Sequence, residues 1–133
     1  MKNSQMKILL VDDDDINNFL TKEILSLQET APNITAHLFV TDALKFLDDA
    51  RRNNQPFPEV ILVDINMPIR NGWDFLDAFE KIDPEARKHT RLYLYTSSVY
   101  YKDIDKAKEY SSVRNVFSKP LTDEMLKEIM TDQ

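Results

Sequence analysis

The sequence contains no cysteine, so its fold cannot depend on disulfide bonds, which suits a reducing compartment. No apolar run approaches the roughly 20 residues that a membrane-spanning helix requires, and the first five residues lack the apolar stretch of a secretion signal. Acidic residues outnumber basic ones by 23 to 17, and the net charge of −6 argues against a nucleic-acid-binding surface. These absences predict a cytoplasmic protein that binds neither a membrane nor nucleic acid.

Glycine is also nearly absent, since Gly72 is the only one in the chain. A chain that uses glycine once is expected to need it there, either for a positive φ angle or for a close approach of two backbone segments. Gly72 ends a loop that begins after Asp64, and apolar residues at helical spacing follow it. We therefore expect this glycine to be needed where the loop turns into the next helix.

Apolar runs alternate with helical patterns along the chain, which is typical of repeated βα units. The expected strands are Lys7–Val11, Ile34–Val40, Val60–Val63, Leu92–Tyr95 and Arg114–Phe117. Parallel strands joined by helices form a right-handed, doubly wound sheet, and polar residues at the strand ends fit the strand order 2-1-3-4-5. The sequence therefore predicts a flavodoxin-like α/β fold with a five-stranded sheet, as one domain over residues 1–133 with its core at about 6–131.

Five helices are expected to follow these strands. The first has an acidic amino terminus formed by Asp14 and Asp15. Its apolar face is formed by residues at helical spacing, namely Ile16, Phe19, Leu20, Ile24 and Leu27. The second helix is expected to be capped by Thr41 and to reach about Arg52, and the third to run from Trp73 to near Asp83. The fourth is expected over Tyr101–Tyr110, with Ile104 and Ala107 toward the sheet, and the fifth from Thr122 through Met130.

Four of the expected strands end in polar residues that can form one site. Asp12 and Asp13 follow the first strand, Asp64 the third, Thr96 the fourth and Lys119 the fifth. The carboxyl ends of parallel strands meet at one edge of the sheet, where α/β folds bind ligands. Each residue alone has an ordinary explanation, such as helix capping or turn formation. Their joint occurrence predicts a site for a phosphoryl group and a divalent cation.

The residue types at this edge suit phosphoryl transfer. A carboxylate such as Asp64 can act as a nucleophile and accept a phosphoryl group as an acyl phosphate. Because Asp12 and Asp13 would repel an incoming phosphate, a cation has to intervene, and Mg²⁺ fits because it prefers oxygen ligands. Lys119 would supply a second positive charge, and Thr96 would supply a hydroxyl to a phosphoryl oxygen.

These motifs resemble those of response regulator receiver domains of two-component signalling. The matching stretches are Lys7–Asp13 (KILLVDD), Val63–Pro68 (VDINMP) with Gly72, Leu94–Ser97 (LYTS) and Lys119-Pro120. The resemblance covers the chain from Met6 to the last helix. Its most specific part is the Asp-x-Asn-Met-Pro stretch followed by glycine four residues after the proline.

The resemblance implies that Asp64 receives its phosphoryl group from a phosphohistidine of a sensor histidine kinase or a histidine phosphotransfer protein. It also implies a ligand set for Mg²⁺: Asp13 directly, Asp12 through water, Asp64, and the backbone carbonyl of Asn66. The chain would then be a phosphoacceptor that assists its own phosphorylation and dephosphorylation, and not a conventional enzyme.

The resemblance further implies that Thr96 and Lys119 contact the phosphoryl oxygens, and that the Lys119–Pro120 bond is cis, as it often is in such domains. A downstream protein would bind the face of helix four, strand five and helix five, and the receiver would be a monomer or a weak dimer. The chain ends after the fifth helix, so we expect a stand-alone regulator or phosphorelay member. Excision from a longer hybrid kinase is the alternative.

One position departs from the family pattern. The family usually has tyrosine or phenylalanine three residues before the lysine, as a ring that turns inward on phosphorylation. Here that position is Val116, and the ring is at Phe117. Either the signal passes without a rotating ring, or Tyr95, Tyr100 or Tyr101 has taken over its role.

Two other functions fit an α/β sheet but not these residues. An aspartate-nucleophile phosphatase typically has a second aspartate two residues after the nucleophile as its general acid–base, and here Asn66 holds that position. A flavodoxin-type cofactor binder needs N–H donors after the first strand, whereas the four aspartates of 12–15 would repel a flavin phosphate. The receiver interpretation is therefore preferred.

Overall fold

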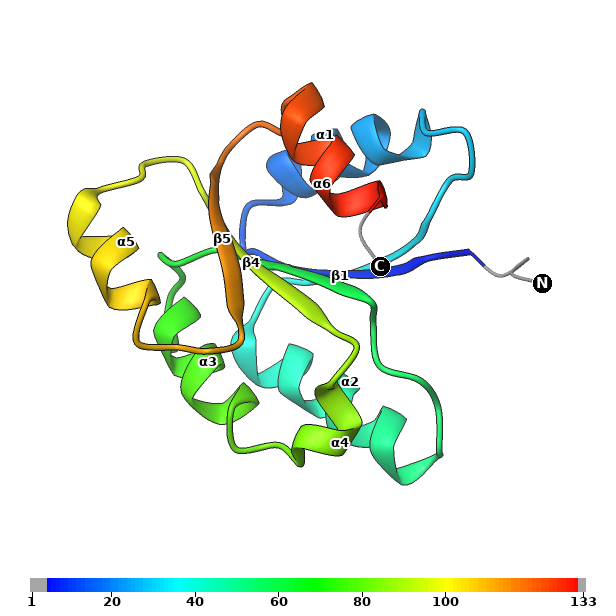
Figure 1. Ribbon diagram of the computed structural model, residues 1–133, viewed down its shortest axis with the longest axis vertical. Coiled ribbons are helices and arrows are strands. Elements are labelled where there is room, and N and C mark those ends of the chain that lie inside the picture. The colour runs from blue at the N-terminus through cyan, green and yellow to red at the C-terminus, as the bar shows by residue number, and fades with distance from the viewer. Residues whose placement is uncertain (1–4, 132–133) are drawn as a thin grey trace.

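Five parallel strands form the central sheet (Figure 1). They are β1 Lys7–Val11, β2 Asn33–His37, β3 Val60–Val63, β4 Arg91–Thr96 and β5 Val113–Ser118. Their order, β2-β1-β3-β4-β5, confirms the predicted topology. The computed structural model describes residues 5–131, so the ends of the predicted domain and most of its polar start, residues 1–4 and 132–133, lie outside the described residues.

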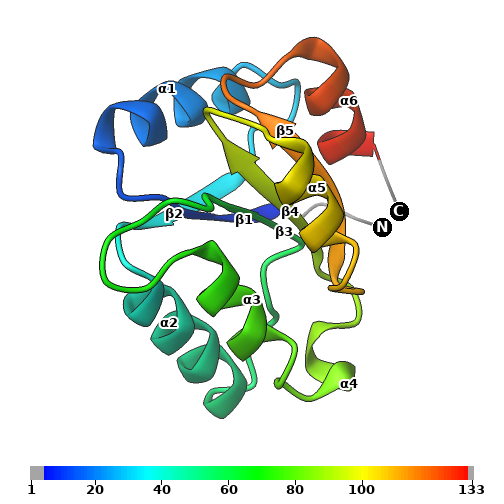
Figure 2. The same cartoon turned by 90° about the vertical axis from the view of Figure 1, so that its left-hand side faces the viewer.

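Six helices, one more than predicted, surround the sheet over residues 5–131. They are α1 Asp15–Ser26, α2 Val40–Arg52, α3 Gly72–Phe79, α4 Pro84–Arg87, α5 Tyr101–Ala107 and α6 Asp123–Thr131. Helices α1 and α6 cover one face, and α2 and α3 cover the other (Figure 2). The additional helix is α4, a single turn that Asp83 caps by accepting from the N–H of Glu85. Within residues 5–131, no helix combines the length and apolar character that crossing a membrane requires.

The core has one layer on each face of the sheet because successive residues of a strand point to opposite faces. In β1, Leu9 and Val11 pack with α2 and α3, whereas Ile8 and Leu10 pack toward α1 and α6. Every residue of β3 and β4 is buried. Burial on both faces is why these strands are continuous apolar runs rather than alternating ones.

The end of β2 and the start of α2 differ from the prediction. The strand ends at His37 rather than Val40, and Val40 is the first residue of α2 and is buried in the core. The residue before the helix is Phe39, which makes no side-chain capping bond, so the predicted cap by Thr41 was wrong. An apolar residue at this junction suits the end of a strand and the inner face of a helix equally well, so its type did not decide between them.

The apolar face predicted for α1 was wrong. Four of its five residues are exposed, namely Ile16 (73%), Phe19 (61%), Leu20 (49%) and Leu27 (83%). The helix instead buries Asn18, Thr21 and Leu25. The acidic start was correct, since Asp14 caps the helix by accepting from the N–H of Asn17 at 3.1 Å.

Arg91 extends β4 beyond its predicted start and is buried, with 6% of its surface exposed. Its guanidinium donates to the backbone carbonyls of Glu128 at 3.2 Å and Ile129 at 3.0 Å, in the last turn of α6. A cation at a helix carboxyl end is favourable, so Arg91 ties β4 to α6.

In α5, Ala107 is buried as predicted, but Ile104 is 39% exposed rather than turned to the sheet.

Candidate functional site

The carboxyl edge of the sheet brings three predicted aspartates together. One carboxylate oxygen from each of Asp12, Asp13 and Asp64 lies within 4.8 Å of the other two. The register explains this, because the last residues of β1 and β3, Val11 and Val63, are directly paired. Asp12 is 2% and Asp64 7% exposed, whereas Asp13 is open to solvent. Two buried carboxylates and one exposed carboxylate form a compact acidic cluster.

Lys119 reaches this cluster from the end of β5. Its Nζ lies 2.6 Å from Oδ2 of Asp12 and 3.4 Å from Oδ2 of Asp64, and its side chain is only 10% exposed. Its backbone N–H donates to the carbonyl of Thr96 at 2.8 Å, which fixes the β5 end against β4. The following bond to Pro120 is cis, as the resemblance implied. The lysine therefore stands between the two buried carboxylates.

Burial and charge oppose each other at this pair. Burial raises the pKa of Asp12 above its ordinary value, and the hydrogen bond from Lys119 only partly offsets this. Burial alone would lower the pKa of Lys119, but its hydrogen bond to Asp12 and the charges of Asp12 and Asp64 outweigh it, so that this pKa is raised. One ammonium therefore does not compensate the buried acidic charge, and the site favours a further cation.

Two buried oxygens at this edge have no hydrogen-bond partner among the described residues: Oδ1 of Asp64 and Oγ1 of Thr96. Buried polar atoms are normally paired, so both atoms are available to something that binds at the site. A carboxylate oxygen suits a divalent cation and a hydroxyl suits a phosphoryl oxygen. The donor set therefore fits Mg²⁺ together with a phosphoryl group.

Asp12 is held in place by groups that the sequence analysis missed. Its carboxylate accepts from the N–H of Asp14 at 3.0 Å and from the Nδ2 amide of Asn17 at 3.2 Å. Its backbone carbonyl accepts from Nδ2 of the buried Asn18 at 2.9 Å. Two asparagines in the first turn of a helix that begins beside an acidic cluster were the available signal for this support.

Gly72 permits a close approach of two backbone segments. A Cβ atom at this position would lie 2.4 Å from the carbonyl oxygen of Asp64 and 2.9 Å from the Cα of Ile65. Its φ angle is not positive, so close approach is the correct one of the two expected reasons. Its N–H donates to the carbonyl of Ile65 at 2.9 Å. The start of α3 therefore packs directly against the backbone of Asp64, the candidate phosphoacceptor.

The loop between Asp64 and Gly72 is exposed to solvent in part, whereas Ile65 lies in the core. Asn66 is exposed, and Ile69 is 91% exposed with φ of 69°. The N–H of Arg70 donates to the carbonyl of Pro68 at 2.7 Å, and this bond closes a γ-turn about Ile69. A β-branched residue at positive φ is unusual, so the loop holds an apolar side chain outward at some cost in strain.

The aromatic ring near the end of β5 belongs to Phe117, the residue after Val116. Phe117 is buried and stacks on Tyr93, with 4.7 Å between ring centroids, so it points into the core. Of the three tyrosines considered as substitutes, Tyr100 is 63% and Tyr101 74% exposed, and only Tyr95 is buried, at 2%. Tyr95 is therefore the one whose ring can respond to an event inside the site.

The sequence profile of the response regulator receiver domain matches residues 8–131. The chain therefore belongs to the response regulator receiver domain family. Receiver domains are phosphoacceptor signalling domains, which accept phosphate from histidine kinases or phosphotransfer proteins and bind Mg²⁺.

Three known proteins are similar to this chain. A two-component response regulator from Cytophaga hutchinsonii is 31% identical with a TM-score of 0.87, over 96% of this chain and 95% of that one. The chemotaxis response regulator CheY4 of Vibrio cholerae, 22% identical with a TM-score of 0.73 over 94% and 95% of the two chains, shares the fold. Hybrid signal transduction histidine kinase I of Dictyostelium discoideum is 28% identical over 127 residues, 96% of this chain but 7% of the kinase.

Proposed function

We propose that this receiver accepts a phosphoryl group on Asp64 and signals through the resulting change in its binding to other proteins, or by passing the group on in a phosphorelay. The observation that carries the proposal is the buried, unpartnered Oδ1 of Asp64 within a cluster of three carboxylates and one lysine. The carboxylate oxygen attacks phosphorus, the bond from phosphorus to the donor histidine nitrogen breaks, and that nitrogen keeps the electron pair. The product is an acyl phosphate, which water hydrolyses.

The neighbouring residues have roles that follow from their chemistry. Lys119 contacts Asp64, and after transfer it would bind a phosphoryl oxygen. The Thr96 hydroxyl, which is free of other partners among the described residues, would donate to another. The ligands for Mg²⁺ would be Asp12, Asp13, Asp64 and the backbone carbonyl of Asn66. When bound, Mg²⁺ neutralises the charge of the phosphoryl oxygens.

The donor protein would contact apolar side chains that border the site. A phosphohistidine can reach Asp64 only if its protein covers the carboxyl edge of the sheet. Exposed apolar residues near this edge include Ile16 and Phe19 on α1 and Ile69 in the loop after β3. Contiguous exposed apolar surface marks protein interaction sites, and a protein that covers this edge would bury these side chains. We therefore assign this rim, Ile16, Phe19 and Ile69, to the histidine kinase or phosphotransfer protein, in the cytoplasm.

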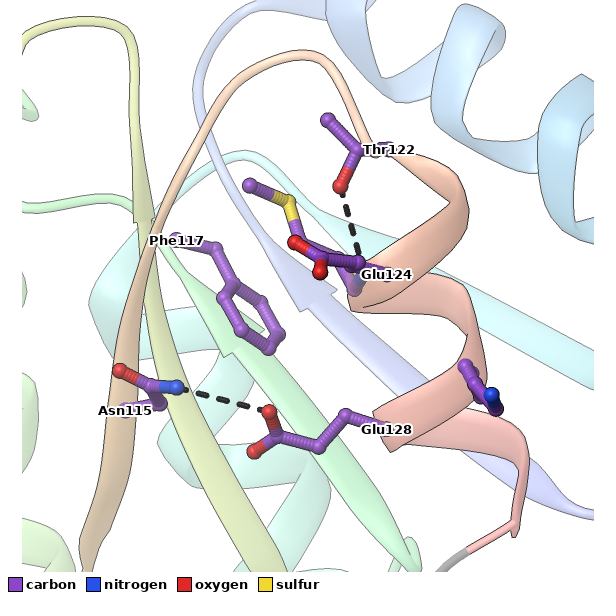
Figure 3. Close-up of a pocket in the computed structure, with 7 residues that line it drawn as sticks. Asn115, Phe117, Thr122, Glu124 and Glu128 are labelled. Atoms are coloured by element: carbon purple, nitrogen blue, oxygen red, sulfur yellow. Dashed lines mark hydrogen bonds between the residues drawn. The ribbon is translucent and has the colours of Figure 1, made fainter.

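The downstream partner would use the face formed by α5, β5 and α6. These elements are the predicted helix four, strand five and helix five, because the additional helix α4 shifts the numbering. A groove separates β5 from α6 on this face, and the ring of Phe117 points toward α6 at its base (Figure 3). Asn115 donates to Glu128 across the groove at 3.4 Å. Phosphorylation would shift the population between two arrangements of this face with different affinity for the partner, in a receiver that is a monomer or a weak dimer.

Incubation with acetyl phosphate and Mg²⁺ tests the phosphorylation. Intact mass spectrometry should show one added phosphoryl group, which hydroxylamine removes because the linkage is an acyl phosphate. Asp64→Asn should abolish the addition, and the matched control Asp105→Asn, at an exposed carboxylate on α5, should not. Normal labelling of Asp64→Asn would refute the assignment, and sustained turnover of p-nitrophenyl phosphate would instead indicate a phosphatase.

A further inference from the structure

Tyr95 connects the candidate phosphorylation site to helix α1. Its ring lies beside Lys119, and its hydroxyl pairs with Thr21 of α1. We propose that Tyr95 is a positioning residue that holds the Lys119 ammonium at the site and transmits the movement of that ammonium to α1. The inference rests on the proposed phosphorylation of Asp64 and adds the route by which that event is reported.

The ring of Tyr95 holds the lysine by a cation–π contact. Nζ of Lys119 lies 5.8 Å from the ring centroid, and both side chains are almost entirely removed from solvent. A desolvated ammonium is attracted to the face of an aromatic ring. On its other side the ammonium is bound by Asp12 and Asp64. The ring and the carboxylates together therefore define where the ammonium lies.

The hydroxyl of Tyr95 fixes the far end of the same side chain to α1. It lies 3.1 Å from Oγ1 of Thr21, which is 1% exposed. The first turn of this helix also donates to Asp12 from Asn17 and Asn18. Helix α1 is thus bonded to the site at two points, directly through Asp12 and indirectly through Tyr95 and Lys119. Its outer side carries Ile16 and Phe19, two of the three exposed apolar residues of the rim.

Phosphorylation changes the charge that Lys119 faces. New anionic oxygens beyond Asp64 attract the ammonium away from Asp12, and this displaces it relative to the Tyr95 ring. The next residue of β4, Thr96, offers its hydroxyl to the same phosphoryl group and accepts from the backbone N–H of Lys119. Two adjacent residues of β4 therefore respond to one event. This arrangement supplies a buried aromatic connection although Val116 lacks the usual ring.

Tyr93 provides a matched control for Tyr95. It lies on the same strand and in the same core cluster, and it is 0% exposed. Its hydroxyl accepts from Arg91 at 3.3 Å, and its ring stacks on Phe117. Removing its hydroxyl therefore disturbs packing and hydrogen bonding in the same layer without touching the Lys119 contact.

Three variants separate the two roles of Tyr95: Tyr95→Leu, Tyr95→Phe and Tyr93→Phe. The first readout is the rate of phosphorylation by acetyl phosphate at saturating Mg²⁺. Tyr95→Leu removes the ring and should slow it about five-fold, the fold-change that corresponds to loss of one cation–π contact. Tyr95→Phe keeps the ring, so its phosphorylation rate should stay within about two-fold of the wild-type rate. The rate of Tyr93→Phe should do the same.

The second readout is hydrogen–deuterium exchange in α1 with and without Mg²⁺ and beryllium trifluoride, a phosphoryl mimic. Exchange in α1 should change on addition in the wild type and in Tyr93→Phe. It should not change in Tyr95→Phe or in Thr21→Val, which remove the two ends of one hydrogen bond. The double variant should behave like either single variant, as expected for residues that act through a shared contact.

The outcomes distinguish this inference from the proposed function. An unlabelled wild type would refute phosphorylation and the inference with it. The wild type could instead be labelled while the phosphorylation rates of Tyr95→Leu and Tyr93→Phe fall equally. This result would show that Tyr95 only packs the core, and it would refute the positioning role alone. A normal α1 response in Tyr95→Phe, which keeps the fold even where Tyr95→Leu does not, would refute the link to α1.

Discussion

At the scale of single residues, Asp12 shows that the site is built for binding rather than for stability. Its carboxylate is almost fully buried, and its pKa is raised by that burial in spite of the ion pair with Lys119. A group whose pKa is raised in the folded state favours folding at pH values below its unfolded pKa. This contribution is lost as the pH rises through the folded-state pKa. Ionised Asp12 therefore costs stability at neutral pH.

Replacing Asp12 by asparagine should remove this cost. Without divalent cations, we expect Asp12→Asn to raise the free energy of unfolding at pH 7 by about 1 kcal/mol, the usual size of a stabilising change at a functional site. The advantage should shrink as the pH falls toward the unfolded pKa of 3.8. Urea unfolding between pH 4 and about 7 measures it. Asp13→Asn, at an exposed carboxylate, is the control, and a less stable Asp12→Asn at pH 7 would contradict the expectation.

The residues that gather at the site were predictable to the extent that their types carry chemistry. Asp12, Asp13, Asp64 and Lys119 follow apolar strands in the sequence, and the fold brings their side chains together. The connection through Tyr95 was not predictable, because a tyrosine in a strand has no signature that distinguishes packing from contact with a distant lysine. Only the distance between its ring and Nζ of Lys119 decided this.

At the scale of elements, α1 is the helix where apolar spacing was misleading. A helical hydrophobic pattern usually faces the core, but here the buried side carries Asn18 and Thr21, which bond to Asp12 and Tyr95. Four of the five apolar residues of the pattern are left on the outside. The helix is attached to the sheet partly by hydrogen bonds at the site, so that its hydrophobic surface remains available to a partner.

This exposed side of α1 should matter for transfer from a protein donor and not from a small molecule. The donor in this test is a histidine-phosphorylated protein that phosphorylates the wild type. Substituting Ile16 and Phe19 by serine should reduce the rate of transfer from this donor by about 30-fold, the effect of losing an interface hot spot worth about 2 kcal/mol. The rate with acetyl phosphate should not change. Leu27→Ser, at an equally exposed residue on the other end of α1, is the control. Equal loss with both donors would refute docking at this rim.

At the scale of the whole molecule, acidic charge is concentrated where a cation is needed. The chain carries a net charge of −6, and three carboxylates at one sheet edge face one lysine. Self-repulsion of this kind is relieved when a cation binds only to the folded state. Such binding stabilises the fold in proportion to the logarithm of the cation concentration above its dissociation constant.

Mg²⁺ should therefore raise the melting temperature of the wild type. At about 100 times the dissociation constant, the gain in unfolding free energy should be about 2.7 kcal/mol. Asp13→Asn and Asp64→Asn should lose most of this gain, and Asp105→Asn should keep it. Potassium chloride at equal ionic strength controls for screening of the net charge, and calorimetry with both salts measures the effect. An equal shift in all variants would show that Mg²⁺ acts by screening alone.

The sequence by itself determined the strands of the sheet and the acidic edge, because buried parallel strands are continuous apolar runs that end in polar residues. Those polar ends also fitted the strand order that the structure shows. It also indicated that Gly72 and Val116 are special positions. Whether the receiver acts without an output domain stays a prediction. The tertiary structure decided which side of α1 is buried, where β2 ends, and that Gly72 serves close approach rather than positive φ. It also placed Tyr95 between Lys119 and Thr21, because such contacts depend on distances between segments that no local pattern encodes.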